Sequence, residues 1–230
     1  LWERALKVVA LIQARMGSKR LPGKSLMPIG GKALIRHVLD RASQIVGVDD
    51  VCLVTSLNAF DTPLAQSWPQ RVYRGSEWDV LGRMDAACRW MNADVVVRIT
   101  GDCPLLASDI SSLVLKTFHQ VQEDYVSNVG RQTRWPDGFD TEVFSAHVLH
   151  EADRCAKTRH DREHVTTWIR SNFERRDVLS QEDYGEVKLS VDRAEDLERV
   201  RHIGEFLPPH DYSAQAVINA VRQCGYLRGM

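Results

Sequence analysis

The chain has 230 residues, of which 30 are basic and 31 acidic, so its formal net charge is −1. This balance disfavours a protein that binds nucleic acid or a membrane surface with its whole face. The five cysteines are scattered without a C-x-x-C pair, which predicts reduced thiols rather than disulfides or a zinc site. Residues Leu1–Arg4 do not begin a signal-peptide pattern, and no apolar run approaches the ~20 residues that cross a bilayer. We therefore expect a cytoplasmic protein with neither a membrane nor a nucleic-acid partner.

Strand-like and helical patterns alternate along the first part of the chain. Continuous apolar runs predict buried strands at 7–14, 50–56, 71–75, 94–100 and 124–128. Amphipathic spacing predicts helices at 33–45, 61–68, 79–91 and near 108–120. This alternation is typical of an α/β fold with a mostly parallel sheet and helices on both faces.

The pattern changes from about Gly130. Residues 130–145 are polar and turn-rich before they become strand-like, so we expect an excursion from the main sheet. Further helices are predicted at 145–156, 161–171, 194–207 and 214–224, with a returning strand at 186–192. We interpret the chain as a single domain, 1–230, with a lobe inserted at 130–175.

A basic, glycine-rich loop follows the first predicted strand. Residues 12–32, IQARMGSKRLPGKSLMPIGGK, contain five cations, four glycines and two prolines. The spacing does not fit a Walker A loop, because five residues separate Gly17 from Gly23 and Pro28 would break the helix that should follow. Backbone N–H groups and cations in such a loop favour phosphate binding, although a solvated basic loop is the alternative.

Two aspartates each follow a predicted strand. Asp102 ends the strand RIT, and Asp192 ends LSV. Ligands of open parallel sheets bind at the carboxyl ends of strands, and carboxylate oxygens suit Mg²⁺. The alternative for Asp192 is a helix N-cap, with Glu195 three residues later as its capping-box partner.

Several motifs together resemble one known family. The opening segment, VVALIQARMGSKRLPGKSLMPIGGKALIRHVL, is similar to that of the cytidylyltransferases that activate 3-deoxy-octulosonic and nonulosonic acids. Within that family the chain most resembles the SpsF-type spore-coat polysaccharide biosynthesis subgroup. The further motifs are YRGSEWDVLGRM, ADVVVRITGDCPLL, DYVSN, WPDGFDTEVFS, REHVTTWI and LSVDRAEDLERV, so the resemblance covers nearly the whole chain in order.

The resemblance implies a Rossmann-like nucleotidyltransferase fold of the glycosyltransferase-A type. It implies that a sugar hydroxyl attacks the α-phosphate of CTP, that pyrophosphate leaves, and that Mg²⁺ is required. The implied catalytic residues are Arg15, Lys24 and Asp102, and the implied metal ligands are Asp102 and Asp192. The implied nucleotide-binding residues are Ala14, Arg15, Met16, Gly17, Lys24, Thr55, Ser56, Gly75, Ser76 and Asp79.

The chain departs from the sugar-acid enzymes in two places. Those enzymes usually have Pro-Ala-Arg where this chain has Gln13-Ala14-Arg15, and they also differ around Thr100-Gly101-Asp102-Cys103. The nucleotide side of the pattern therefore matches well, whereas the motifs do not fix the acceptor.

Polar clusters at the ends of elements predict where the acceptor binds. We expect the acceptor over the inserted lobe, with turn and capping chemistry as the alternative reading of the same residues. The candidates are Ser127, Asn128, Asp140, Glu142, Arg162, Glu163 and His164. A homodimer is also expected, since the related enzymes dimerise and the lobe carries aromatic residues of a kind that interfaces favour.

Three alternatives to CMP transfer onto a sugar acid stay open. One is a glycosyltransferase of the same fold, in which Asp102 holds Mg²⁺ under the diphosphate of a sugar nucleotide. Another is a nucleotide-binding module without turnover. The last is cytidylyl transfer to a phosphonate or a sugar phosphate.

Overall fold

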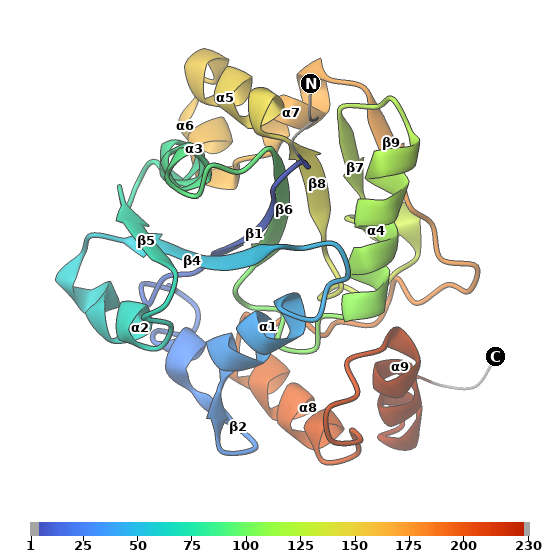
Figure 1. The fold of residues 1–230 in the computed structure, drawn as a ribbon. Coiled ribbons are helices and arrows are strands. Elements are labelled where there is room, and N and C mark those ends of the chain that lie inside the picture. Colours follow the sequence, from blue (N-terminus) through green and yellow to red (C-terminus); the bar gives the residue numbers. More distant parts are fainter. Residues whose placement is uncertain (1–4, 228–230) are drawn as a thin grey trace.

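The centre of the molecule is a mixed sheet. The computed structural model describes residues 5–227, so the prediction drawn from Leu1–Arg4 lies outside the described residues. Within them, seven strands lie in the order β5 (Val72–Gly75), β4 (Asp50–Ser56), β1 (Val8–Gln13), β6 (Val95–Thr100), β8 (Glu142–Ser145), β7 (Tyr125–Ser127) and β9 (Arg175–Asp177) (Figure 1). Every neighbouring pair is parallel except the two pairs that β8 makes. The predicted α/β fold with a mostly parallel sheet is confirmed.

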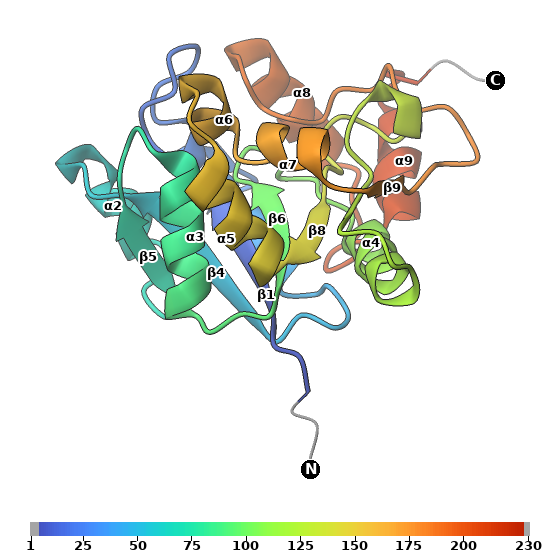
Figure 2. The same cartoon turned by 90° about the horizontal axis from the view of Figure 1, so that it is seen from above.

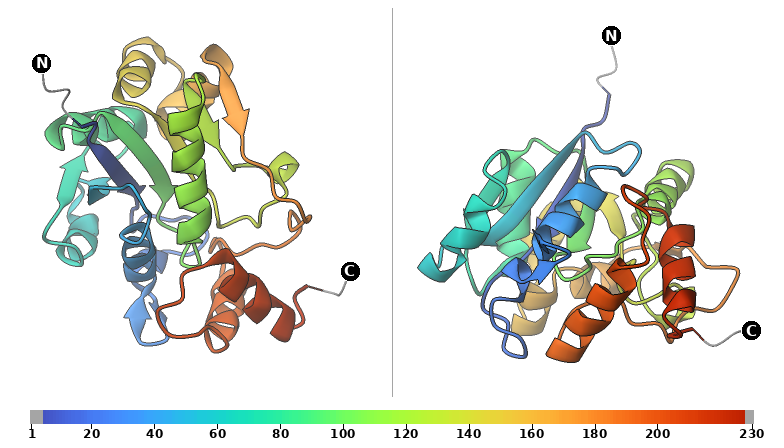
Figure 3. Two further views of the ribbon diagram at one scale, coloured as in Figure 1. Left: turned by 45° about the vertical axis from the view of Figure 1, so that its right-hand side comes forward. Right: turned by 90° about the horizontal axis from the view of Figure 1, so that it is seen from below.

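Helices cover both faces of this sheet (Figures 2 and 3). One apolar core joins a face of the sheet to α1 (Leu34–Ala42), α2 (Thr62–Gln66), α4 (Ser108–Gln120), α8 (Ala194–Gly204) and α9 (Ala214–Gln223). The opposite core joins the other face to α3 (Val80–Trp90), α5 (Ala146–Cys155) and α7 (Thr167–Asn172), with α6 (Arg159–His164) packed against α3. Alternate residues of β1 supply the two cores, Ala10 and Ile12 the first and Val9 and Leu11 the second, as a strand buried on both faces requires.

Short elements complete the first half of the chain. The basic loop ends in a 3₁₀ turn, η1 (Lys24–Leu26), and a small antiparallel hairpin of β2 (Pro28–Ile29) and β3 (Lys32–Ala33) leads into α1. A second 3₁₀ turn, η2 (Ala59–Asp61), precedes α2, and a third, η3 (Arg131–Thr133), follows β7. In the part of the chain that the structure describes, no helix combines the length and apolar character needed to cross a bilayer.

The second half of the chain differs from its predicted elements in three places, one of which is β9, a strand that no sequence pattern predicted. Residues 186–192 do not form a sheet strand, because their N–H groups bind loops: Leu189 and Ser190 donate to the carbonyl of Asp137, and Val191 donates to that of Asp102. The helix predicted at 161–171 breaks between α6 and α7, where Val165 adopts a positive φ of 64°. The segment 186–192 thereby reaches the carboxyl end of β6 as a loop.

The segment 130–175 is partly integral to the sheet. It supplies β8, which lies between β6 and β7, and the three helices α5, α6 and α7 on the α3 side. Strand β8 is antiparallel to both of its neighbours, whereas the strands that the first half supplies to this sheet are parallel to one another. The acceptor-binding and dimerisation roles expected of this segment stay predictions.

Candidate active site

A polar cleft opens at the carboxyl ends of the central strands. Its volume is about 510 Å³. Its lining comes from the end of β1 and the following loop, the first turn of α3, the end of β6, the end of α6 and the loop before α8. This is the edge of the sheet at which open parallel α/β folds bind their ligands.

The basic loop is anchored by its own backbone and by a buried carboxylate. The N–H groups of Ser18 and Gly23 both donate to the carbonyl of Met16, and Gly23 adopts a φ of 76°, which glycine tolerates best. The N–H of Met16 donates to Asp61 Oδ1 at 2.6 Å. These contacts hold the loop in one conformation, in which Lys19 and Arg20 line the cleft.

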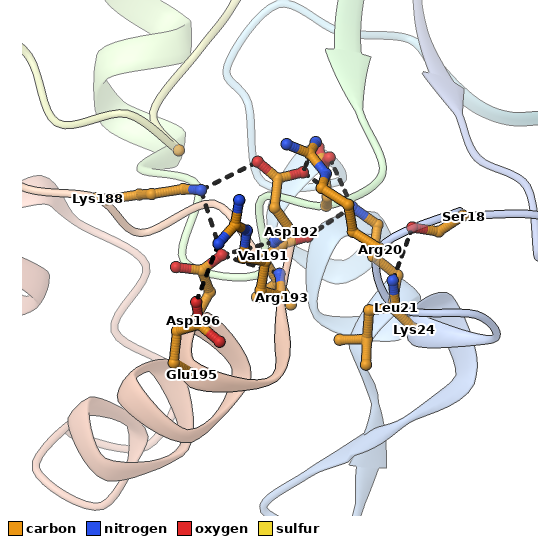
Figure 4. A network of polar contacts seen from close by, with 12 residues as sticks. Ser18, Arg20, Leu21, Lys24, Lys188, Val191, Asp192, Arg193, Glu195 and Asp196 are labelled. Atoms are coloured by element: carbon orange, nitrogen blue, oxygen red, sulfur yellow. Dashed lines mark hydrogen bonds and ion pairs between the residues drawn. The ribbon is translucent and has the colours of Figure 1, made fainter.

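Lys24 joins Asp102, which follows β6, to Asp192, which lies in the loop before α8. Its Nζ lies 3.0 Å from Asp102 Oδ2 and 3.5 Å from Asp192 Oδ1, and it donates to the carbonyl of Val191 at 2.5 Å. Arg20 and Lys188 also contact Asp192, at 2.6 and 3.0 Å (Figure 4). Burial opposes ionisation of Asp192, but the hydrogen bond from Lys188 and the neighbouring cations outweigh it and lower the pKa of this carboxyl.

The two aspartates fit a magnesium site. A single ammonium group reaches both carboxylates, so both can face one cation. Among the described residues no cluster of three or more His, Cys, Asp and Glu side chains could hold a metal, and Asp102 and Asp192 stay the candidate ligands. Mg²⁺ suits such a site, since it is often bound by one or two carboxylates together with water and substrate phosphates.

The aspartate before α8 is not the helix cap. Helix α8 begins after Arg193, and Asp196 accepts hydrogen bonds from the N–H groups of Asp192 (3.0 Å) and Arg193 (2.9 Å). The alternative pairing of Asp192 with Glu195 is therefore wrong, because the capping carboxylate belongs to Asp196. This leaves the carboxylate of Asp192 to the cations of the cleft (Figure 4).

The opposite wall of the cleft is formed by α3 and α6. Glu163 and His164 line the cleft, and Arg15 Nη2 lies 3.6 Å from Glu163 Oε1. Asp79 caps α3 by accepting from the N–H of Gly82 at 2.9 Å, and Arg162 binds Asp79 by Nε at 2.8 Å and Nη2 at 2.5 Å. Burial opposes ionisation of Asp79, but the hydrogen bond from Arg162 outweighs it and lowers the pKa. Asp79 and Arg162 therefore bind each other and join α3 to α6.

This geometry can be compared with known proteins. The model of the cytidylyltransferase family matches residues 9–206. The chain belongs to the cytidylyltransferase family. The spore coat polysaccharide biosynthesis protein SpsF of Bacillus subtilis is 30% identical over 84% of this chain and 85% of its own length.

Further relatives of this cytidylyltransferase agree with that assignment. The 3-deoxy-manno-octulosonate cytidylyltransferase of Escherichia coli is 33% identical over 47% of this chain and 45% of its own. A solved cytidylyltransferase from Leptospira borgpetersenii superimposes with a TM-score of 0.90 at 28% identity and covers 96% of each chain. The predicted family resemblance and the nucleotidyltransferase fold are confirmed.

The structure brings only part of the predicted nucleotide-binding set into the cleft. Ala14, Arg15 and Lys24 line it, together with the metal-ligand candidates Asp102 and Asp192. Ser56 is fully buried and donates to Asp61, and Thr55 is fully buried with no hydrogen-bond partner for Oγ1 among the described residues. Four further residues of this set do not line the cleft. Met16 and Gly17 lie in the basic loop, Gly75 ends β5, and Ser76 lies between β5 and α3.

Only some of the predicted acceptor-binding residues line the cleft. Glu163 and His164 line the cleft of the cytidylyltransferase, whereas Ser127, Asn128 and Glu142 are buried outside its lining. Asn128 uses its amide to tie loops, since Nδ2 donates to the carbonyl of Phe139 at 2.9 Å and Oδ1 accepts from the N–H of Thr141 at 2.7 Å.

Asp140 lies in an enclosed acidic region. It is partly exposed yet surrounded by protein, and burial together with the charge of Asp137 raises the pKa of its carboxyl to about 7. Burial likewise raises the pKa of Asp137, with the charges of Asp102 and Asp192 acting in the same direction. This region therefore carries a carboxyl group whose charge changes near neutral pH.

The sequence patterns did not single out three residues of the site: Gln13, Asp61 and Arg83. Arg83 lines the cleft although it is only 3% exposed, and burial lowers its pKa to about 10, so its guanidinium remains charged at neutral pH. Its place in the first turn of a helix after a strand is a signal that could have found it. Asp61 carried no such signal, because its role depends on contacts with Met16 and Ser56.

Proposed function

We propose that this cytidylyltransferase transfers CMP from CTP to a sugar-acid acceptor, with Mg²⁺ as its metal and pyrophosphate as the product. The observation that carries the proposal is the cleft itself. A folded basic loop faces Asp102 and Asp192, whose carboxylates converge on one cation, Lys24. A polyphosphate chain with a bound divalent ion complements this arrangement of charges.

The reaction forms one bond and breaks one. An oxygen of the acceptor attacks the α-phosphorus of CTP, and the bond from that phosphorus to the bridging oxygen of the β-phosphate breaks. The electron pair of the broken bond leaves with pyrophosphate, and the proton of the attacking hydroxyl passes to solvent. Such transfers depend mainly on in-line positioning and on neutralising phosphate charge.

The residues of the chain divide this work. Arg15, Lys19, Arg20 and Lys24 supply positive charge toward the triphosphate. Asp102 and Asp192 would hold Mg²⁺, which when bound neutralises phosphate charge. Arg83 adds a buried, preoriented cation at the foot of α3.

Further nucleotide contacts are proposed for the buried edge of the sheet. Thr55 Oγ1 is a buried hydroxyl without a partner among the described residues, next to Ser56 at the end of β4. Gly75 ends the neighbouring strand β5, and Ser76 and Asp79 follow it, so the base and ribose would lie on this side. The acceptor would lie near Glu163 and His164 of α6.

The biological setting follows from the relatives. The name of the SpsF relative concerns spore-coat polysaccharide, and the name of the Escherichia coli relative specifies an octulosonate. We therefore assign this chain to the synthesis of a surface polysaccharide or glycoconjugate, in the cytoplasm and as a homodimer. Light scattering that shows a monomer at micromolar protein concentration would contradict the dimer.

The test of the proposed function is a two-way screen. Each of the four nucleoside triphosphates is incubated with Mg²⁺ and a panel of sugar acids, sugar phosphates and phosphonates, and release of pyrophosphate is measured. We expect release with CTP and a sugar acid only, and none when Mg²⁺ is replaced by EDTA. Binding of CTP without pyrophosphate release from any acceptor would contradict turnover. Release of a nucleoside diphosphate or of CMP from a sugar nucleotide would indicate a glycosyltransferase instead.

A further inference from the structure

The side chain of Gln13 has one end of its amide bound to the protein. Gln13 is the last residue of β1, lines the cleft and is partly exposed. Its Oε1 lies 3.1 Å from Nε and 2.9 Å from Nη2 of Arg98. A guanidinium group can only donate hydrogen bonds, so this contact decides which end of the amide is the oxygen. The Nε2 group therefore points away from Arg98.

The Nε2 end is open to the cleft. Its two N–H donors have no acceptor among the described residues. Nor is it enclosed, since the buried unpaired polar side-chain atoms of the described residues are Arg41 Nε, Thr55 Oγ1 and Arg83 Nε. Two oriented donors thus face the space in which a substrate binds.

A buried network fixes the orientation of this amide. Arg98 is 7% exposed and pairs through Nη1 with Glu142, which is 3% exposed. The carboxylate of Glu142 is held in turn by three further groups: Tyr125 Oη at 2.5 Å, Thr166 Oγ1 at 2.7 Å and Arg170 Nη2 at 2.5 Å. Because these contacts fix Glu142, and Glu142 pairs with Arg98, the guanidinium of Arg98 cannot turn away from Gln13 without leaving buried charges unpaired.

The network also decides toward which side of the cleft the amide leans. Gln13 lies two and four residues after Leu11 and Val9 in β1, so it shares their face and faces the helix layer of α3, α5 and α7. Arg98 belongs to β6, on the opposite side of β1 from β4, so the contact draws the amide away from β4 and β5. The cleft residues on this side of the sheet are Val80 and Arg83 of α3 and Glu163 and His164 of α6, which packs against α3.

We propose that Gln13 is a specificity-determining residue whose Nε2 donates a hydrogen bond to an oxygen of the acceptor. Arg98 and Glu142 are then positioning residues, which act through Gln13 and touch no substrate. The inference rests on the proposed function, since it requires a second substrate beside CTP.

The substitution Gln13→Glu separates this role from a structural one. A glutamate keeps the size of the side chain and still offers Arg98 a carboxylate oxygen. It replaces the open donor with an anionic oxygen, which repels the oxygen of an acidic acceptor. The control is Gln120→Glu, which makes the same charge change at an exposed position at the end of α4.

Two constants and the thermal midpoint are measured for the wild type and both variants. The first is the KM of the sugar acid that gives the fastest pyrophosphate release in the wild type, and the second is the Kd of CTP by calorimetry without acceptor. For Gln13→Glu we expect the acceptor KM to rise at least about tenfold. The Kd of CTP should stay within about threefold, and the thermal midpoint should equal or exceed that of the wild type. Gln120→Glu should leave all three unchanged.

Three results would overturn the inference, and they can be told apart. If Gln13→Glu leaves both constants unchanged, Gln13 serves only to bind Arg98. If the Kd of CTP changes as much as the acceptor KM, Gln13 contacts the nucleotide. If the wild type itself releases no pyrophosphate with any acceptor, the proposed function fails, and the role of Gln13 fails with it.

Discussion

Two groups of charged residues meet near the end of β6, and they differ in what surrounds them. Lys24, Asp102 and Asp192 lie in the cleft with side chains that are 11%, 28% and 20% exposed. Arg98 and Glu142 lie beneath the cleft, and their side chains are 8% and 3% exposed. Charges of the first group can exchange partners with a substrate, whereas those of the second hold each other and the side chain of Gln13 in place.

The comparison teaches that ion pairs near an active site have two separate uses. In the cleft, the ammonium of Lys24 rests on the carboxylates that a divalent cation would take, so the pairs are ready to be replaced. Beneath the cleft, Glu142 is satisfied by four side chains, and its removal would leave buried cations without a partner. Substitutions in the first group should therefore change turnover, and substitutions in the second should change stability.

The largest effect is expected for the aspartate pair. Asp102→Asn and Asp192→Asn each remove one anionic ligand while preserving shape, so turnover should fall by about 10²–10³. The double variant should be little worse than the worse single one, because residues that act as a unit are not additive. Both thermal midpoints should stay near the wild type, since the carboxylates are partly exposed. Values of kcat with Mg²⁺ and melting curves check this, and a fully active Asp192→Asn would refute the shared site.

Glu142→Gln should act mainly on the fold. Burial opposes ionisation of Glu142, but Arg98, Arg170 and the hydrogen bond from Tyr125 outweigh it and lower the pKa to about 2. Breaking a buried pair of this kind costs about 3 kcal/mol, or roughly 6–12 °C in the thermal midpoint. A depressed carboxyl pKa stabilises the fold above the pKa of the unfolded chain. The wild type should therefore lose this advantage over the variant as the pH falls from about 5 to 2.

Melting curves of the wild type and of Glu142→Gln, recorded at neutral pH and over this pH range, check that prediction. A midpoint of Glu142→Gln within 2 °C of the wild type at neutral pH, about the scale of a surface substitution, would show that the buried network contributes little.

Asp140→Asn should raise the stability of the fold, whereas Glu142→Gln should lower it. Burial and the charge of Asp137 raise the pKa of Asp140 to about 7, so ionisation of this group destabilises the fold as the pH rises from about 4 to 7. Asparagine avoids that cost. We expect no gain near pH 4 and a gain of about 2 kcal/mol, roughly 5 °C, that is constant above pH 7. Melting curves in EDTA from pH 4 to 8 measure it, and a gain that is the same at every pH would exclude the electrostatic cause.

The smallest effect on stability is expected at the rim of the cleft. The side chain of Arg20 is 59% exposed and pairs with Asp192, so Arg20→Ala should cost less than 1 kcal/mol of stability. Loss of one phosphate-facing cation should weaken CTP binding by about three- to tenfold, more so at low salt. Lys19→Ala is the matched variant, since Lys19 also lines the cleft. Calorimetry at two salt concentrations measures the Kd of CTP for both variants. If neither substitution changes this Kd, the triphosphate binds elsewhere.

The boundaries of most elements could be predicted because they depend on local patterns. The buried strands β1, β4 and β6 are continuous β-branched runs, and α3 and α9 repeat apolar residues at helical spacing. Residues 186–192 carry a strand-like pattern too, but their hydrogen bonds go to Asp102 and Asp137, whose positions no local pattern reveals. The same limit hid the break at Val165, which separates α6 from α7.

The sequence by itself determined the mostly parallel sheet, the basic loop after β1 and the carboxylate that follows β6. Each follows from residues adjacent in the chain, where apolar periodicity, glycine spacing and charge act over a few positions. Only the tertiary structure decided which of those groups face one another. Lys24 contacts Val191 across 167 residues, and Arg98 contacts Glu142 across 44. Such contacts depend on how strands are ordered in the sheet, and strand order is set by the packing of the whole core rather than by any one segment.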